Sequence, residues 1–174
     1  GKIASIVNWG SNVENSIPRK VLETTCNVHR DAALPKFHKQ TFLAKDQNKT
    51  KSVNSEAPGY GRKVVIYATC FVNYNNPSIG TSAVNVLNIN GVETEVVYPS
   101  CCGMPQLEQG NIEDVAKAAE KVAKELRVWV DEGNDIIALT PSCALMLKFE
   151  WPLILPENEA VSYTHLTLPT RAVV

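Results

Sequence analysis

The chain has 174 residues, of which 44% are hydrophobic and 20% charged, and its formal net charge is -1, a composition typical of a globular protein. No apolar run approaches the roughly 20 residues of a membrane-spanning helix, and the first residues lack the basic head and apolar run of a secretion signal. The net charge hides an asymmetry, because residues 1–63 carry 11 Lys and Arg against 5 Asp and Glu, whereas the remainder carries 6 against 13.

Residues 1–43 are predicted to form a basic leader ahead of the domain. Pro18 opens a short helix that runs to about Asp31, and Pro35 prevents its continuation. Residues 44–62 are poor in large apolar side chains and rich in Lys, Asn, Ser, Gly and Pro, which favours a linker. The positive charges are compatible with docking on an anionic partner or membrane surface, but their scatter favours a solvated segment.

The domain is predicted to begin near Lys63 with a strand over residues 64–68. Its continuous apolar run is typical of a parallel strand that is buried on both faces. Asn76 and Pro77 supply an N-cap and a first-turn proline for a helix that Gly91 ends. The apolar face of this helix, which we expect to be buried, comprises Ile79, Ala83, Val86 and Leu87.

A second strand is predicted over residues 94–98, and a long amphipathic helix follows. Asn111 caps this helix, with Asp114 in the capping-box region, and Gly133 ends it. Its apolar positions step by three and four residues and are Ile112, Val115, Ala119, Val122, Leu126 and Trp129. A third apolar strand is predicted over residues 136–139.

The last predicted element is a short helix from Cys143 to Glu150, which stops before Trp151 and Pro152. The order β-α-β-α-β-α with short connections predicts a parallel sheet with right-handed crossovers. The fold class is therefore α/β, a small three-layer domain of about three parallel strands in the order 2-1-3 with flanking helices.

Each predicted strand leads into cysteine, first Cys70, then the doublet Cys101 and Cys102, and finally Cys143. Because the carboxyl ends of parallel strands meet at one edge of a sheet, we expect the four sulfurs to converge there. Helices begin beside these cysteines, so backbone N–H groups and helix dipoles would stabilise thiolates. Four thiols in a chain without a secretion signal indicate a metal or redox site rather than a structural disulfide.

Three stretches of the sequence bear these cysteines. The first, Tyr67–Tyr74, contains one cysteine, the second, Tyr98–Pro105, contains Cys-Cys-Gly, and the third, Pro141–Lys148, contains Pro-Ser-Cys. This pattern resembles the cysteine-rich CCG domain of iron–sulfur proteins, which occurs in one of the subunits of anaerobic glycerol-3-phosphate dehydrogenase and in one of those of heterodisulfide reductase. The resemblance covers about residues 20–161. It implies a cluster of the 4Fe-4S type, cubane or non-cubane, with these ligands: Cys70, Cys101, Cys102 and Cys143.

The same resemblance implies an electron-transfer component, with no catalytic residue of its own, of an anaerobic respiratory oxidoreductase. Such a component relays electrons between a flavoprotein dehydrogenase and a quinone or another acceptor. It implies other oxidoreductase subunits as partners, no nucleic acid, and a cytoplasmic location with peripheral association at the inner face of the cytoplasmic membrane.

The chain departs from the family pattern in several ways. Met146 stands where the full motif has a second cysteine, which leaves four candidate ligands, enough for one cluster. The cysteine spacing of ferredoxins, which family members carry upstream, is absent. We therefore expect a fragment, in which residues 63–160 form the first half of a two-module unit. Residues 161–174 resemble a translated sequencing adapter and are predicted to be a non-native tail.

Two alternatives remain open. A thiol–disulfide redox protein would need a bridge between distant loops, such as Cys70 with Cys143, because vicinal cysteines form only a strained ring. A structural zinc site could use thiolates from three strand ends, although paired Cys-x-x-Cys spacing is absent. Outside the pattern, Cys26 is expected to be a small buried residue, and His29 and His38 are expected to be ordinary surface residues.

Overall fold

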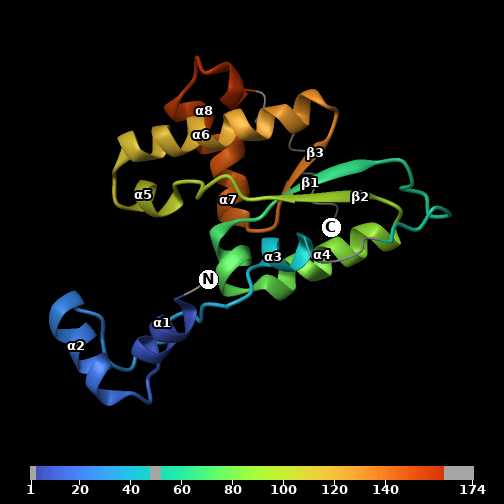
Figure 1. The fold of residues 1–174 in the computed structure, drawn as a ribbon. Coiled ribbons are helices and arrows are strands. Elements are labelled where there is room, and N and C mark those ends of the chain that lie inside the picture. The colour runs from blue at the N-terminus through green and yellow to red at the C-terminus, as the bar shows by residue number, and fades with distance from the viewer. Residues whose placement is uncertain (1–2, 48–51, 163–174) are drawn as a thin grey trace.

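The computed structural model describes residues 3–47 and 52–162, so the predicted tail from residue 163 onward lies outside the described residues. One sheet of parallel strands consists of β1 (Lys63–Tyr67), β2 (Glu93–Val97) and β3 (Asp135–Ala138). The spatial order is β2-β1-β3 (Figure 1), with β1 hydrogen-bonded to both neighbours. The predicted α/β class and the strand order 2-1-3 are confirmed.

The described residues also form helices and two π-helical turns. In chain order they are α1 (Ala4–Ser11), α2 (Ser16–Cys26), α3 (Phe42–Gln47), η1 (Phe71–Asn75), α4 (Pro77–Ile89), α5 (Met104–Glu108), α6 (Ile112–Asp131), α7 (Pro141–Leu145), η2 (Met146–Glu150) and α8 (Trp151–Ile154). Helices α6 and α8 lie over one face of the sheet, and α3 and α4 lie over the other (Figure 1). Among the described helices, none is long and apolar enough to cross a membrane.

The central strand β1 fills both halves of the core. Val65 and Tyr67 pack with α6 and the C-terminal helices, whereas Val64 and Ile66 pack with α3 and α4. Successive side chains of a strand point to opposite faces, so the continuous apolar run of β1 fits a strand covered on both sides. This is the three-layer arrangement that the sequence predicts.

Helix α6 buries most of its predicted stripe. The Asn111 side chain accepts a hydrogen bond from the Asp114 N–H at 3.3 Å, which confirms the predicted N-cap. The central positions of the stripe are fully buried and are Val115, Ala119, Val122 and Leu126. The stripe positions in the terminal turns are less covered, since Ile112 is 46% exposed and Trp129 is only partly buried.

The buried face of α4 differs from the prediction. Ile79 and Val86 are exposed, whereas Gly80 and Val84 are buried. The cause is Phe42 of α3, because a Cβ at position 80 would come within 2.6 Å of the Phe42 ring. The helix therefore presents its glycine to the aromatic ring. Two of the four predicted residues do pack against the core, namely Ala83 and Leu87.

The last helical segment does not stop before Trp151 and Pro152, as the sequence predicts. Helices α7 and α8 are joined through η2, and the segment runs from Pro141 to Ile154. Pro152 stands in the first turn of α8, where a missing N–H costs no hydrogen bond. This continuation brings Trp151 into the core, where its side chain is fully buried.

The N-terminal residues 3–37 form a helical extension, called the arm here, which projects from the sheet domain (Figure 1). Helix α2 ends at Cys26, before the predicted Asp31, because Asn27 adopts a left-handed conformation with φ of 54°. Arg19 is only 1% exposed. Its guanidinium donates hydrogen bonds of 2.7 or 2.8 Å to the carbonyl oxygens of His29, Arg30 and Ala32.

The residues after the arm are attached to the turn η1, which follows Cys70. The His38 N–H donates a hydrogen bond to the Tyr74 carbonyl at 2.8 Å. The Leu43 N–H of α3 donates to the Asn73 side-chain oxygen at 3.0 Å. Helix α3 spans the border at which the leader was predicted to pass into the linker, and its Phe42 belongs to the domain core.

Candidate functional site

The structure brings the four strand-end cysteines together at the carboxyl edge of the sheet. Cys70 precedes η1, Cys101 and Cys102 lie between β2 and α5, and Cys143 lies in α7. The Cys101 and Cys70 sulfurs are 4.0 Å apart, and the Cys102 and Cys143 sulfurs are 3.3 Å apart. All four are free thiols. The adjacent residues of the doublet therefore contact two different loops.

The two sulfur pairs differ in their access to solvent. Cys102 and Cys143 are buried, at 1% and 4% exposure. Cys70 and Cys101 are half-buried. The site thus has an inner pair within the core and an outer pair at its surface, where a partner molecule can approach.

Backbone N–H groups at or just before the start of η1 and α5 bond to three of the sulfurs. The Phe71 N–H bonds to Cys70, those of Cys102 and Gly103 bond to Cys101, and that of Met104 bonds to Cys102. Each of these bonds lowers the pKa of the thiol that receives it, because it favours the negatively charged form. Backbone donors of the predicted kind are thus present for Cys70, Cys101 and Cys102, whereas the stabilisation of thiolates by helix dipoles stays a prediction.

Hydrogen bonds among the thiols separate their pKa values. The hydrogen bonds that Cys101 shares with Cys102 and Cys70 lower the pKa of Cys101. The bond with Cys102 likewise lowers the pKa of Cys143. The bonds with Cys101 raise the pKa of both Cys70 and Cys102, and burial raises it further. The direction of the pKa shift therefore alternates along the chain of contacts, upward at Cys70 and Cys102 and downward at Cys101 and Cys143.

Hydroxyl groups support the inner pair. Thr69 is fully buried, and its hydroxyl lies 2.7 Å from that of Thr140. Side-chain hydrogen bonds from Ser142 and Thr69 help to lower the pKa of Cys143. Burial, followed by the negative charges of the cysteines, raises the pKa of Tyr67. The Tyr67 hydroxyl is thus kept protonated and remains a hydrogen-bond donor.

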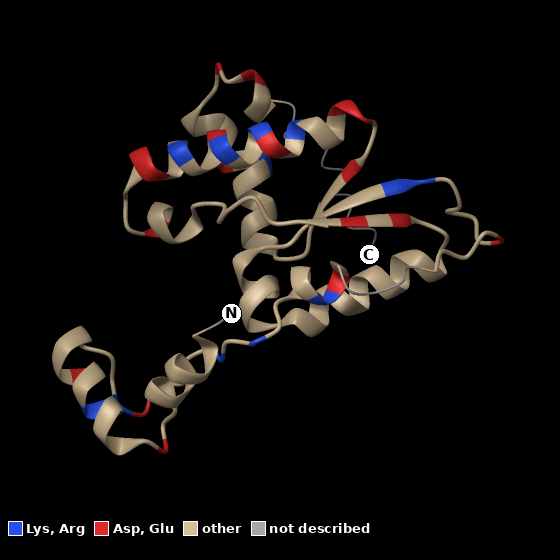
Figure 2. Ribbon diagram, in the orientation of Figure 1, with Lys and Arg blue, Asp and Glu red and all other residues tan. Residues whose placement is uncertain are grey.

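Sulfur is the main ligand chemistry that this edge offers. The cysteine-bearing segments 64–76, 96–107 and 136–147 contain no Asp, Glu, His, Lys or Arg. Figure 2 shows the charged residues mainly on α6, on the strands and in the loops, while α7 is uncoloured. Within residues 3–47 and 52–162, no group of three or more His, Cys, Asp or Glu is arranged to hold a single metal ion.

Other residues that the sequence pattern emphasises lie elsewhere. Cys26, predicted to be buried, is exposed in the last turn of α2, a helix in the arm whose one buried residue is Arg19. Met146 is fully buried in the core beside Cys143. His29 and His38 are exposed, as predicted.

Two residues that the sequence does not assign to the site contact the Cys-Cys loop. The Tyr67 hydroxyl donates a hydrogen bond to the Ser100 carbonyl at 2.7 Å, and the Trp151 indole donates to the Cys102 carbonyl at 3.0 Å. Their only signal in the sequence is that each aromatic side chain has a polar atom that needs a partner when buried.

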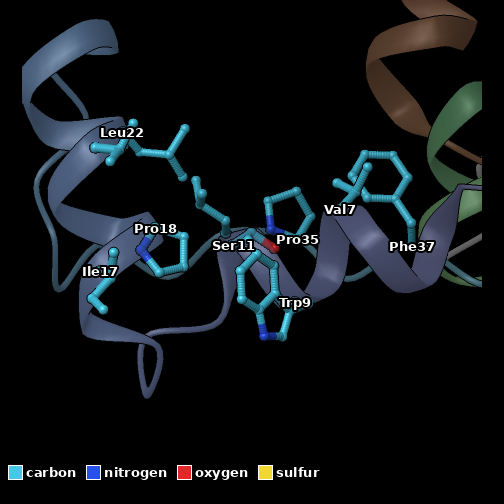
Figure 3. A pocket seen from close by; sticks show the side chains of 11 residues that line it. Val7, Trp9, Ser11, Ile17, Pro18, Leu22, Pro35 and Phe37 are labelled. Carbon is cyan, nitrogen blue, oxygen red and sulfur yellow. The ribbon is translucent and has the colours of Figure 1, made fainter.

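The arm contains an apolar groove of about 660 Å³ between α1, α2 and residues 34–37 (Figure 3). Its walls include Trp9, Pro18, Leu22 and Phe37. Among the described residues that line this groove there is no cysteine, so its chemistry is separate from that of the sulfur site.

Comparisons with known proteins identify a family and several relatives. Residues 64–148 match the family model of the CCG cysteine-rich domain. Over 170 residues the chain is 28% identical to the subunit designated C of anaerobic glycerol-3-phosphate dehydrogenase from Escherichia coli K12, covering 97% of this chain and 41% of that protein. Over 161 residues it is 26% identical to the subunit designated B of fumarate reductase (CoM/CoB) from Methanothermobacter marburgensis, covering 87% and 32%.

A third relative is lactate utilization protein A of Bacillus pumilus, 30% identical over 99 residues, which is 55% of this chain and 39% of that protein. The chain thus spans between about a third and two fifths of the length of these relatives. No solved structure matches it. The Escherichia coli match extends well beyond residues 64–148, so the arm belongs to the shared segment.

Proposed function

Because residues 64–148 form a CCG cysteine-rich domain, homologous to subunits of anaerobic dehydrogenases and reductases, we propose that the chain is an iron–sulfur electron-transfer part of such an oxidoreductase. The observation that carries this proposal is the convergence of four thiols from three loops at one uncharged edge of the sheet. Conversion of the substrate belongs to another subunit of the same assembly.

The cluster ligands in this proposal are Cys70, Cys101, Cys102 and Cys143. Thiolate sulfur is the soft ligand that iron–sulfur clusters require, and the N–H groups around the sulfurs favour negative charge. A four-iron cluster takes one thiolate per iron, so its ligands do not have to surround a single point. The residues present supply the soft ligands of such a cluster, and no three of them in the described part of the chain are arranged around a single ion.

A bound cluster of this kind would supply reversible electron transfer. The chain's own part is to provide the thiolates, to direct backbone N–H groups at them, and to keep other charges away. The half-buried outer pair, Cys70 and Cys101, is the side through which electrons would enter or leave.

The cluster in this proposal is of the 4Fe-4S type, and it lies on an electron route between two partners. The donor is a flavoprotein dehydrogenase, and the acceptor is a quinone or another carrier. The assembly would work in the cytoplasm at the inner face of the membrane. The relatives, a dehydrogenase subunit and a fumarate reductase subunit, support an oxidoreductase partner.

Anaerobic reconstitution of the chain with ferrous iron and sulfide tests the cluster. We expect a broad charge-transfer absorption, a paramagnetic resonance signal after reduction, and iron and sulfide in equal amounts. Cys101→Ser and Cys143→Ser should each abolish the signal, whereas Cys26→Ser, which changes an exposed thiol outside the site, should keep it. Circular dichroism verifies that each variant is folded. A folded wild-type chain that assembles no cluster would refute the proposal.

A second candidate function is thiol–disulfide exchange, favoured by the 3.3 Å contact between the Cys102 and Cys143 sulfurs. This is a different pair from the Cys70–Cys143 bridge considered from the sequence. Its formation would need the sulfurs to approach to about 2.05 Å, with two electrons and two protons passing to a disulfide oxidant. Treatment with oxidised glutathione without iron should then remove two free thiols, and Cys102→Ser should prevent this.

A further inference from the structure

We propose that Tyr67 and Trp151 are positioning residues that hold the loop at Ser100–Cys102, so that the adjacent sulfurs of Cys101 and Cys102 face different partners. The inference deepens the proposed function, because it rests on these two sulfurs being cluster ligands. Neither aromatic side chain is a ligand itself.

The need for positioning arises from the doublet. Cys101 contacts Cys70, and Cys102 contacts Cys143 on another loop. A rotation of the backbone between the two residues would exchange or break these contacts. Ser100, Cys101 and Cys102 belong to no helix or strand. In the described part of the chain, they make none of the turn and loop hydrogen bonds between backbone groups.

The two aromatic side chains supply what the backbone lacks. The carbonyl groups of Ser100 and Cys102 stand on either side of Cys101, and each accepts a hydrogen bond from a buried side chain. Tyr67 donates to the first at 2.7 Å and Trp151 donates to the second at 3.0 Å. The Ser100 carbonyl belongs to the peptide unit before Cys101, and the Cys102 carbonyl belongs to the unit after Cys102, so the two bonds fix the backbone at both ends of the doublet.

Both donors are themselves firmly held. Tyr67 belongs to the central strand β1, Trp151 begins α8, and each side chain is fully buried. They come from elements 33 residues before and 49 residues after their respective acceptors. A buried donor without its acceptor loses a hydrogen bond and the hydration it had when unfolded, so these contacts favour one loop conformation.

Substitutions that remove a hydrogen-bond donor, compared with controls that remove similar groups elsewhere, distinguish a positioning role from packing alone. Tyr67→Phe keeps the ring and removes only the hydroxyl, and Trp151→Phe removes the indole N–H together with some volume. Trp129→Phe, at a partly buried position on α6, is the control for lost indole volume. Tyr60→Phe, on an exposed tyrosine, is the control for a lost hydroxyl.

The first measurement needs no cluster. The reduced 174-residue chain is pulsed with iodoacetamide, and the rate of modification of each cysteine is determined by mass spectrometry. We expect Cys102 to be protected in the wild type, and to react about tenfold faster in Tyr67→Phe and Trp151→Phe because loss of one buried hydrogen bond raises the open population by that order. Cys26 should react at the same rate in every variant.

The second measurement is the paramagnetic resonance spectrum and midpoint potential of the reconstituted chain, which should shift in both variants and in neither control. Unchanged protection of Cys102 in Tyr67→Phe and Trp151→Phe would overturn the inference, as would an increase matched by Trp129→Phe. If no cluster assembles in the wild type, the proposed function fails, and the alkylation rates alone still decide whether the two residues position the loop.

Discussion

Replacing Arg19 by methionine should open the arm without unfolding the sheet domain. The Arg19 guanidinium is buried, and it is surrounded by backbone carbonyl oxygens of the segment that follows α2. Methionine has a similar length and fills part of the same space, but it cannot donate a hydrogen bond. The substitution therefore leaves these carbonyl groups without the hydrogen bonds that Arg19 donates.

The size of the effect can be worked from the three short bonds, which measure 2.8, 2.8 and 2.7 Å. A hydrogen bond to a charged group contributes about 1.5–3 kcal/mol, and the three are not additive because the released carbonyls regain water when the arm opens. We therefore expect a loss of about 3 kcal/mol in the local stability of the arm, which raises its open population roughly a hundredfold.

Hydrogen–deuterium exchange followed by mass spectrometry measures this directly. In Arg19→Met, the amides of α2 should exchange roughly a hundredfold faster, while those of β1 and α6 keep the wild-type rate. Arg30→Met is the matched control, because Arg30 makes an exposed ion pair with Glu23 at 2.6 Å and such pairs contribute little. Equal acceleration of α2 in both variants, or no acceleration in Arg19→Met, would refute the reasoning.

Two further predictions concern the sheet domain. Gly80→Ala should displace the buried Phe42 ring, since the new Cβ would lie 2.6 Å from it. Urea titration should show a free energy of unfolding that is lower by about 2 kcal/mol. In the control Gly10→Ala, the new Cβ has nothing within 4 Å, so the free energy of unfolding should be equal or higher. Hydrogen bonds from Lys117 and Asn111 lower the pKa of Asp114 in the folded protein. The Asp114 carboxylate therefore stabilises the fold above the ordinary carboxyl pKa of about 3.9. This stabilisation is lost as the pH falls through the lower pKa of the folded state. Asp114→Asn should therefore reduce the difference between the urea midpoints at about pH 6 and about pH 3; an unchanged difference would contradict this.

The sequence predicts the edge at which the cysteines meet, because parallel strands joined by short crossovers bring their carboxyl ends together. It does not predict which sulfur contacts which. That pairing depends on the backbone of a loop without regular structure, and the side chains bonded to this loop, Tyr67 and Trp151, are distant in sequence. The doublet alone is compatible with several pairings.

Packing across elements explains the other differences. The apolar stripe of α6 identifies its buried face correctly, since the helix lies against the sheet along most of its length. The stripe of α4 does not, because Phe42 from outside the predicted domain occupies the Gly80 side. Arg19 looks like a surface residue in the sequence, and only the folded arm shows the carbonyl groups that surround it.

Residues that contact each other at the site are far apart in the sequence, and this affects the order in which the protein folds. The Cys101–Cys70 contact joins residues 31 apart, the Cys102–Cys143 contact joins residues 41 apart, and the Trp151 bond to the Cys-Cys loop spans 49 residues. Contacts between distant residues form slowly, because long loops must close first. During synthesis from the N-terminus, the edge is complete only after residue 151 has left the ribosome and α8 has docked. In the proposed function, cluster insertion would therefore be a late step, and until then the four thiols would be open to oxidation.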